Sequence, residues 1–316
     1  MIFLKFSIII PVKRFNPMLE QCLNDCLKQK NAEVIVIPDV AFKFEGVRVL
    51  TLKGSPSDKR DFAAKKAKGE FLAFIDDDAF PDNDWLKNSL KYFKEGVVAV
   101  AGPAVTPEGE ELKRNASGLI FSSFIGGGGL GYRYVKGFSK EVDDYPSVNF
   151  IVKKSDFEEV GGFDTKYWPG EDTILCLKLK KLGRKIIYTG DVVVFHHRRR
   201  LFGEHLKQVF SYALHRGFFA KKYPENSLKA KYFIPSVFVL SVVAGLILSL
   251  FYSWAFLALA LVLFVYFLVV LLESLKTAFK EGSVELFFLF FAGVILTHFF
   301  YGVGFIKGLL SKDLTR

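Results

Sequence analysis

Phe71-Leu72-Ala73-Phe74-Ile75-Asp76-Asp77-Asp78 is the stretch of this sequence that decides the fold. Five consecutive apolar residues, followed here by three aspartates, are typical of a strand buried inside a parallel sheet. Ligands of such sheets bind beyond the carboxyl ends of the strands, where the three aspartates fall. Carboxylates this close repel one another, and a divalent cation, Mg²⁺ or Mn²⁺, relieves the repulsion by taking one or two of them together with substrate phosphate oxygens. The stretch therefore predicts a metal site that handles a phosphate compound.

Two other interpretations of the aspartate turn stay open. One is an acidic turn that caps the helix expected near Asp84, although Asp82 and Asp84 already serve that purpose. The other is a phosphatase of the haloacid dehalogenase type, in which a strand also ends in Asp-x-Asp. Those enzymes carry Thr or Val two residues after the second aspartate, whereas Asp78 is followed by Ala79-Phe80. The metal site for a phosphate compound is therefore the favoured interpretation.

Apolar runs and helical patterns alternate around this stretch, which predicts an α/β protein with a mostly parallel sheet covered by helices. The residues 103–147 are less regular and include Gly126-Gly127-Gly128-Gly129, which lacks the Gly-Lys-Ser/Thr ending of a phosphate-binding P-loop. This glycine run is either a lid near the site or a plain surface loop. The strands are expected at 6–12, 34–37, 47–52, 70–75, 97–101, 148–152, 186–188 and 192–195, and the helices at 17–28, 58–68, 84–93, 155–160, 172–182 and 200–223.

The last part of the chain is apolar enough for a membrane. The 316 residues are 51% hydrophobic, with a mean hydropathy of +0.26, and residues 233–272 contain no Asp, Glu, Lys or Arg. A bilayer core of ~30 Å needs ~20 apolar helical residues, so this run predicts two spans, at about 233–252 and 253–272. Residues 286–306 are expected as a third span, and a re-entrant or interfacial helix is the alternative. A wholly soluble enzyme and a disordered chain are both excluded.

Positive charge gathers just before the first span. The net charge is +10, and residues 196–232 contain nine Lys or Arg against two Glu. Basic residues beside a span favour the cytoplasmic side and an anionic lipid bilayer as partner, and no nucleic acid polymer is expected. Apolar residues at helical spacing in 200–223 predict an amphipathic helix at the membrane interface, with an ordinary surface helix as the alternative.

These features predict three regions in a multi-pass protein of the cell (inner) membrane. They are a cytoplasmic catalytic domain at 1–199, a basic interfacial region at 200–232 and a transmembrane region at 233–316.

Acidic residues also open a later helix, in Trp168-Pro169-Gly170-Glu171-Asp172. A carboxylate at a helix start is favoured electrostatically whatever its role. The functional interpretation is a general base that accepts the proton of an attacking hydroxyl. Trp168 beside it offers an apolar face to a sugar or a lipid.

Histidine and arginine follow the last expected strand. His196 is either a further metal ligand or a residue that packs and hydrogen-bonds. Arg198 or Arg199 is suited to hold a diphosphate, or to face lipid headgroups.

The order of these motifs along 1–223 resembles glycosyltransferase family 2, whose members have a GT-A fold. Any one motif is weak evidence, whereas five in the right order are strong. The matching elements are Ser7-Ile8-Ile9-Ile10-Pro11-Val12, Asp39, Arg60-Asp61-Phe62-Ala63-Ala64, Asp76-Asp77-Asp78, Gly161-Gly162-Phe163-Asp164, Glu171-Asp172, and His196-His197-Arg198 with Gln208, Tyr212 and Arg216.

The chain departs from the family pattern in three places. Asp39 stands in Ile37-Pro38-Asp39-Val40, where the family often has paired acids, and this leaves the identity of the nucleotide open. Asp61 replaces the usual Asn after Arg60. No Gln-x-x-Arg-Trp motif occurs, which argues against a processive polysaccharide synthase.

The resemblance implies an inverting, metal-dependent transfer from a nucleotide-diphosphate sugar to a hydroxyl of a membrane-associated, lipid-linked or glycan acceptor. A polyprenyl-phosphate sugar synthase is the close alternative, and a non-catalytic nucleotide-sugar-binding membrane protein is the alternative from another class. By this resemblance Asp172 and Glu171 are catalytic, Pro11, Val12, Asp39, Arg60, Asp76 and Asp77 bind the nucleotide sugar, Asp76, Asp78 and His196 hold Mg²⁺ or Mn²⁺, and Trp168, Arg198, Gln208, Tyr212 and Arg216 contact the acceptor or the diphosphate.

Overall fold

The computed structural model describes residues 5–314, which divide into two compact units. The first unit comprises residues 5–107 and 132–197, and the second comprises 108–131 and 198–314. The segment 108–131 thus belongs to the second unit, although it lies inside the region 1–199 expected as one domain. The reason is packing, because Ala116 and Ile120 share a hydrophobic cluster with Leu201 and with residues of the C-terminal helices.

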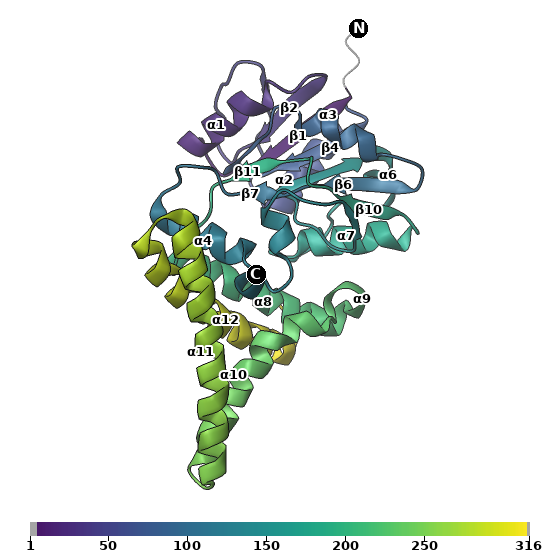
Figure 1. Ribbon diagram of the computed structural model, residues 1–316. Helices are drawn as coiled ribbons and strands as arrows, with labels where there is room; N and C mark the ends of the chain where they lie inside the picture. Colours follow the sequence, from purple (N-terminus) through teal and green to yellow (C-terminus); the bar gives the residue numbers. More distant parts are fainter. Residues whose placement is uncertain (1–4, 315–316) are drawn as a thin grey trace. The chain divides into compact units, whose positions relative to one another are not determined.

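An eight-stranded sheet forms the centre of the first unit, in the order β3-β2-β1-β4-β9-β6-β10-β8 (Figure 1). The sheet is mostly parallel. Within the described chain, β9 runs antiparallel to both of its neighbours and β8 runs antiparallel to β10. The strands are β1 (Phe6–Pro11), β2 (Ala32–Ile37), β3 (Val47–Val49), β4 (Phe71–Ile75), β6 (Val97–Ala101), β8 (Lys140–Val142), β9 (Asn149–Lys153) and β10 (Lys185–Tyr188).

Helices bury both faces of this sheet, which explains the uninterrupted apolar runs of its inner strands. Successive residues of β4 point to opposite faces, so Ala73 belongs to the core beside Trp85, while Phe74 belongs to the core beside Phe157 and Phe163. The helices of this unit are α1 (Pro17–Cys26), α2 (Pro56–Lys66), α3 (Trp85–Ser89), α6 (Lys154–Glu159) and α7 (Glu171–Lys181), with 3₁₀ turns at Leu90–Tyr92 and Gly131–Tyr134.

A small second sheet differs from expectation and matters for the site. It consists of β5 (Ala79–Pro81), β11 (Val194–His196) and β7 (Ala104–Val105). The strand expected at 192–195 is shifted to Val194–His196, and His196 lies opposite Ala79 in the antiparallel pair β11–β5. This register brings His196 beside the residue that follows the three aspartates.

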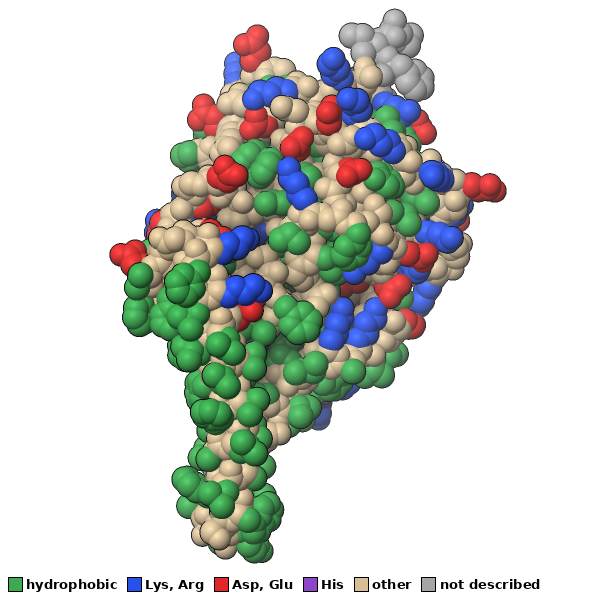
Figure 2. All heavy atoms as spheres, in the orientation of Figure 1, with side chains coloured by type: hydrophobic (Ala, Val, Ile, Leu, Met, Phe, Trp, Pro, Cys, Tyr) green, Lys and Arg blue, Asp and Glu red, His purple; other side chains and the backbone are tan. Residues whose placement is uncertain are grey.

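The second unit is helical and carries the long apolar helices. Its elements are α4 (Leu112–Ser122), α5 (Phe124–Gly127), α8 (Gly203–Lys222), α9 (Pro224–Ser227), α10 (Ala230–Ser249), α11 (Ser253–Glu281) and α12 (Val284–Leu310). The last three are each long and apolar enough to cross a membrane. They begin within three residues of the expected spans, and α11 extends nine residues beyond the end expected at 272. Hydrophobic side chains cover the outside of α10 and α11 (Figure 2).

The apolar side of α8 is buried against α12. Leu206, Val209 and Ala213 are buried, and the two backbones approach so closely that a Cβ on Gly217 would lie 2.1 Å from the carbonyl oxygen of Phe305. A Cβ on Gly308 would lie 2.0 Å from that of Leu214. Small residues are typical where apolar helices pack closely. The apolar face predicted to lie on the membrane is therefore covered by another helix of the same chain.

Candidate active site

The aspartate turn follows β4, and each of its three side chains has a different partner. Asp76 Oδ1 lies 2.6 Å from Nη2 of Arg60. Asp77 Oδ2 accepts a hydrogen bond of 3.1 Å from Nδ2 of Asn16, the residue that caps α1. Asp78 Oδ1 lies 3.1 Å from Nε2 of His196. The turn therefore presents its carboxylates in three directions at the edge of the sheet.

Crowding of carboxylates changes the protonation of this turn. Burial raises the pKa of Asp77 to about 6, and the charges of Asp78 and Asp76 add to the rise, while the hydrogen bond from Asn16 opposes it. The shift has the sign expected where negative charges gather. A bound cation would lower the pKa again.

Arg60 joins this turn to the acidic pair at the start of α7. Its side chain is 3% exposed, and its Nη1 lies 3.2 Å from Oε1 of Glu171 while its Nη2 holds Asp76. The guanidinium also lies over the ring of Phe163, at 5.5 Å from the centroid. In the described part of the chain its Nε is buried without a hydrogen-bond partner. Two carboxylates from distant segments therefore share one buried cation.

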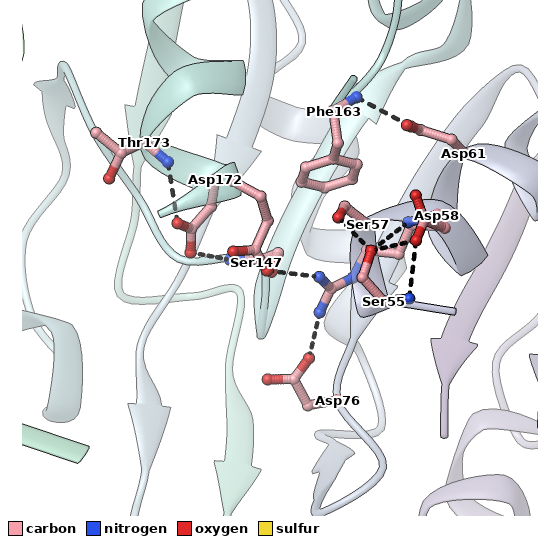
Figure 3. A network of polar contacts seen from close by, with 11 residues as sticks. Ser55, Ser57, Asp58, Asp61, Asp76, Ser147, Phe163, Asp172 and Thr173 are labelled. Carbon is pink, nitrogen blue, oxygen red and sulfur yellow. Dashed lines mark hydrogen bonds and ion pairs between the residues drawn. The ribbon is translucent and has the colours of Figure 1, made fainter. Parts of the chain in front are cut away.

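Glu171 and Asp172 open α7 and are held differently. Burial raises the pKa of Glu171 to about 7, with Asp172 adding to the rise and Arg60 opposing it. Asp172 Oδ1 accepts the backbone N–H of Thr173 at 2.9 Å and its Oδ2 accepts that of Ser147 at 3.3 Å. Burial and the nearby Asp144 raise the pKa of Asp172 above its usual value. Figure 3 shows Asp172 beside Thr173 and Ser147, with Asp76 apart from these three residues.

Asp61, which stands where the family usually has Asn, has a clear structural role. Its Oδ1 accepts the N–H of Phe163 at 2.9 Å (Figure 3). Its Oδ2 accepts the N–H of Asp164 at 3.1 Å. The carboxylate thus holds the Gly-Gly-Phe-Asp loop through two backbone contacts. Gly162 has a φ of +67°, and a Cβ there would lie 2.5 Å from Asp61 Oδ1, so this loop requires glycine.

A second buried cation, Lys59, lies where β1 and β2 end. Its Nζ donates to the carbonyl oxygen of Val12 at 2.5 Å and forms an ion pair with Asp39. The Lys59 side chain is 2% exposed, whereas that of Asp39 is 32% exposed. Pro11 is the last residue of β1. The structure therefore brings together Pro11, Val12 and Asp39, three of the residues predicted to bind the nucleotide sugar.

Lys59 is not among the residues predicted to form the site, although the sequence carries a signal for it. Lys59 stands four residues before Ala63, which is buried on the inner side of α2. A charged residue on the buried stripe of a helix needs a partner. Asn16 was also missed, and it carries no comparable pattern.

A hollow of about 310 Å³ lies between the start of α2 and the loop before α7. Trp168 lines one side of this hollow and is half exposed. On the α2 side, the Ser55 hydroxyl is used in the helix cap, because it donates to Asp58 at 2.6 Å and accepts the Asp58 N–H at 3.1 Å (Figure 3). The hollow thus has an aromatic wall and a polar wall. Its lining consists of Ser55, Ser57, Asp58, Thr165, Lys166, Tyr167 and Trp168.

The side chains present fit a divalent cation that is completed by substrate. No group of three or more His, Cys, Asp or Glu side chains with metal-binding geometry occurs among residues 5–314. Asp78 and His196 nevertheless converge to 3.1 Å, and one or two protein ligands are usual for a cation that also binds substrate phosphates. Asp76, the third predicted ligand, directs one oxygen to Arg60 instead.

The remaining predicted contacts belong to the second unit. There the Arg198 carbonyl oxygen accepts from Nη1 of Arg114 at 2.6 Å, and Gln208 Nε2 donates to the Tyr212 hydroxyl at 3.1 Å. The Arg216 guanidinium lies 4.8 Å from the ring centre of Tyr232. A role of these residues at the acceptor or the diphosphate stays a prediction.

Comparison with known proteins agrees with this geometry. The model of the family described as "Glycosyl transferase family 2" matches residues 7–161. A dolichyl N-acetyl-alpha-D-glucosaminyl phosphate 3-beta-D-2,3-diacetamido-2,3-dideoxy-beta-D-glucuronosyltransferase of Methanococcus voltae is 23% identical, and the alignment covers 98% of each chain. Glycosyltransferase AglE of Haloferax volcanii is 25% identical over 65% of this chain and 70% of its own.

Among solved structures, the fold is similar to that of the mannosyltransferase PcManGT from Pyrobaculum calidifontis in complex with GDP-Man and Mn²⁺. The TM-score is 0.55 at 19% identity, with 98% of this chain and 88% of the other covered. The α/β sheet, the aspartate turn and the matched family model therefore agree, which confirms the predicted fold and enzyme class. Residues 7–161 therefore belong to glycosyltransferase family 2, and the first unit has the GT-A fold.

Proposed function

We propose that this enzyme transfers a sugar, with inversion at the anomeric carbon, from a nucleoside diphosphate sugar to a hydroxyl of a lipid-linked saccharide. The observation that carries the proposal is the Arg60 bridge, because it connects the aspartate turn with the acidic pair of α7. The turn is suited to the diphosphate of the donor and the pair is suited to the acceptor. An enzyme that joins two substrates needs both groups in one fixed arrangement.

Asp39 is suited to the nucleoside part of the donor. One of its carboxylate oxygens is bound by Lys59, and the partly exposed carboxylate retains an oxygen that can accept from a ribose hydroxyl or a base N–H. Lys59 also binds the carbonyl oxygen of Val12, so it fixes Asp39 relative to the end of β1. We assign Lys59 as a positioning residue for the nucleoside.

Charge develops on the diphosphate as the glycosidic bond breaks. A divalent cation, held by Asp78 and His196, would supply positive charge at this place when bound. Asn16 fixes Asp77 in the turn through its hydrogen bond. Arg60 restrains Asp76 from the other side.

Asp172 is the residue we assign as general base. Its two carboxylate oxygens are oriented by the N–H groups of Ser147 and Thr173, and its raised pKa makes the carboxylate a stronger proton acceptor. It would take the proton of the acceptor hydroxyl as the oxygen attacks. Glu171 is occupied by Arg60 and therefore positions the pair rather than accepting the proton.

The acceptor is proposed from two kinds of support. The relative from Methanococcus voltae is named for transfer to a dolichyl phosphate-linked sugar. The hollow beside Trp168 combines an aromatic face with polar groups, a combination that suits a sugar ring. A bare polyprenyl phosphate is already anionic near neutral pH and has little need of a base such as Asp172.

The side of the membrane is part of the proposal. Nine basic residues in 196–232 precede the first apolar helix, and such clusters favour the cytoplasmic side with its anionic lipids. We therefore assign the catalytic unit to the cytoplasmic face of the cell membrane.

A transfer assay tests the proposal. Membranes that contain the protein receive a panel of labelled nucleotide sugars with Mn²⁺, together with either a dolichyl phosphate-linked monosaccharide or dolichyl phosphate. We expect label in the organic phase with the linked sugar, in the inverted anomeric form, and much less with Asp172→Asn. Transfer to bare dolichyl phosphate that is unaffected by Asp172→Asn would instead identify a polyprenyl-phosphate sugar synthase. Retention of the anomeric configuration would overturn the mechanism.

A further inference from the structure

The helices α10 and α11 form an antiparallel hairpin with a free tip. Phe238 and Tyr266 pack at 4.4 Å between ring centroids, and a Cβ on Gly245 would lie 3.0 Å from Leu259. The tip is the turn 250–252, and the base is the opposite end, with Ala230 and Glu281. At 1.5 Å per residue the two helices are about 30 and 43 Å long, which is enough to cross a bilayer.

Both ends of α12 lie at the base of this hairpin. Its first residue, Val284, follows the end of α11 at Glu281 after two residues. Near its other end, Phe305 packs on Phe233 with 4.8 Å between centroids, and Phe233 belongs to the first turn of α10. The carbonyl oxygen of Gly302 accepts from the Ser236 hydroxyl at 3.1 Å. A helix that crossed the membrane beside the hairpin would have one end at the tip.

The second half of α12 runs parallel to α8. His205 Nε2 lies 2.9 Å from the hydroxyl of Thr297, and Lys221 Nζ donates to the carbonyl oxygen of Ser311 at 2.7 Å. The chain thus advances by 16 residues in α8 and by 14 in α12 between these two contacts. Figure 1 shows α12 crossing the hairpin beside α8 rather than running along it. The two helices form one layer at the hairpin base.

One stripe of α12 stays exposed and is mainly apolar. Phe299, Val303, Lys307 and Leu310 follow one another at spacings of four, four and three residues, and all four are exposed, as is Phe288 further back. Lys307 stands in the last turn of the helix, from which a lysine side chain can reach the lipid headgroups. The opposite side is buried by α8, α10 and α11. An apolar stripe on one side of a packed helix is suited to lie along the acyl boundary of a bilayer, in the plane of the membrane.

The charges support the same arrangement. Residues 233–272 are uncharged, so the tip has no basic residue, whereas Lys276 and Lys280 stand near the hairpin base. Lys307 and Lys312 stand at the end of α12. If α12 lies across the base, all four lysines are on the side of the basic segment 196–232, in agreement with the positive-inside tendency.

We propose that the chain crosses the membrane only twice, through α10 and α11. In this arrangement α12 and α8 form a layer in the membrane interface, and the C-terminus is on the same side as the catalytic unit. The proposal departs from the third span expected for 286–306. It goes beyond the proposed enzymatic function and does not depend on it.

Cysteine labelling tests this topology in the full chain. Cys22, Cys26 and Cys176 are fully buried, so the unchanged protein serves as the blank for a membrane-impermeant maleimide. Single cysteine substitutions at exposed positions show on which side of the membrane three parts of the chain lie. They are Ser253→Cys at the hairpin tip, Lys312→Cys after α12, and Lys87→Cys in the catalytic unit, where the Lys87 side chain is 73% exposed. Asp313→Cys gives a second report on the C-terminus. Intact cells are compared with inverted vesicles.

We expect Lys312→Cys and Asp313→Cys to react in the same preparation as Lys87→Cys, and Ser253→Cys to react only in the opposite one. Reaction of both C-terminal cysteines together with Ser253→Cys would show a third crossing and overturn the proposal. Reaction of Ser253→Cys together with Lys87→Cys would show that the hairpin does not cross, and would overturn it as well. Neither result bears on catalysis, because no activity is measured.

Discussion

Arg60 and Glu171 form an ion pair of 3.2 Å in which both side chains are buried, although 111 residues separate them in the sequence. Breaking such a pair leaves an uncompensated charge in the interior. The contact also links α2 to α7, the two helices that carry groups of the candidate active site. One side chain, Arg60, therefore holds the aspartate turn and the start of α7 together.

Replacement of Arg60 should destabilise the catalytic unit. Arg60→Met leaves Asp76 and Glu171 without their shared partner, and the expected loss is about 3–5 kcal/mol in the free energy of unfolding. Chemical denaturation in detergent measures it. Arg48→Met is the matched control, because Arg48 is 38% exposed and its ion pair with Glu33 is 3.5 Å long, so its loss should be below about 1 kcal/mol. Equal losses in the two variants would contradict the role of Arg60.

Replacement of Asp172 should abolish base catalysis and leave the fold intact. For Asp172→Asn we expect kcat to fall by ~10²–10⁴-fold, since the amide cannot accept the proton of a hydroxyl. Initial rates of sugar transfer give this value, and binding of the nucleoside diphosphate should change little. Asp84→Asn, an exposed carboxylate before α3, is the control and should keep full activity. Unchanged turnover in Asp172→Asn would refute the assignment of the base.

Glu171 should make stability depend on pH. Its pKa is raised to about 7 in the folded chain, against an ordinary value near 4.5. The folded state therefore binds the proton more tightly than the unfolded state, and stability is lost as the pH rises from about 4.5 through 7. We expect the free energy of unfolding of the unchanged protein to fall over this range by more than that of Glu171→Gln. Parallel pH curves for the two proteins would show that Glu171 does not titrate there.

Lys59 should affect donor binding more than turnover. Lys59→Met frees Asp39 from the end of β1, so KM for the nucleotide sugar should rise about ten- to hundredfold, as for loss of a charged hydrogen bond, with kcat little changed. Lys59→Arg should restore part of the affinity. Lys65→Met, exposed on the same helix, is the control. A fall in kcat with unchanged KM would place Lys59 outside donor binding.

Removal of divalent cations should stop transfer. Chelation is expected to abolish activity, and Mn²⁺ or Mg²⁺ should restore it. Asp78→Asn and His196→Ala should each raise the cation concentration needed for half-maximal activity, because these two side chains converge in the structure. Asp84→Asn, which changes an exposed carboxylate before α3, is expected to leave this concentration unchanged. Full activity after chelation would refute the metal prediction.

The sequence predicted the parts of the site that lie directly after apolar strands. Asp76, Asp77 and Asp78 follow a strand whose burial is evident from its composition, and the rule for parallel sheets gives their position. Asp172 was found in the same way, from its place at a helix start. In each case the residue and the element that positions it are neighbours in the chain.

The missing parts depend on contacts between distant segments. Lys59 gains its partner from β2, and Asn16 gains its partner from the turn after β4. The small sheet that brings His196 beside Ala79 joins strands more than 100 residues apart. The packing of α12 on α8 was also beyond prediction, because an uncharged run of 21 residues has the same composition whether it crosses a bilayer or lies across other helices.

The division of the chain has a practical consequence for anyone who wishes to obtain the catalytic unit without the membrane. Residues 108–131 belong with the helical unit, yet they interrupt the catalytic one. A chain that ends after residue 197 would keep α4 and α5 but expose their apolar sides to water. A chain that ends after residue 230 would also expose the apolar side of α8. Either fragment is expected to aggregate, so a water-soluble version requires a short linker in place of 108–131 in addition to the C-terminal truncation.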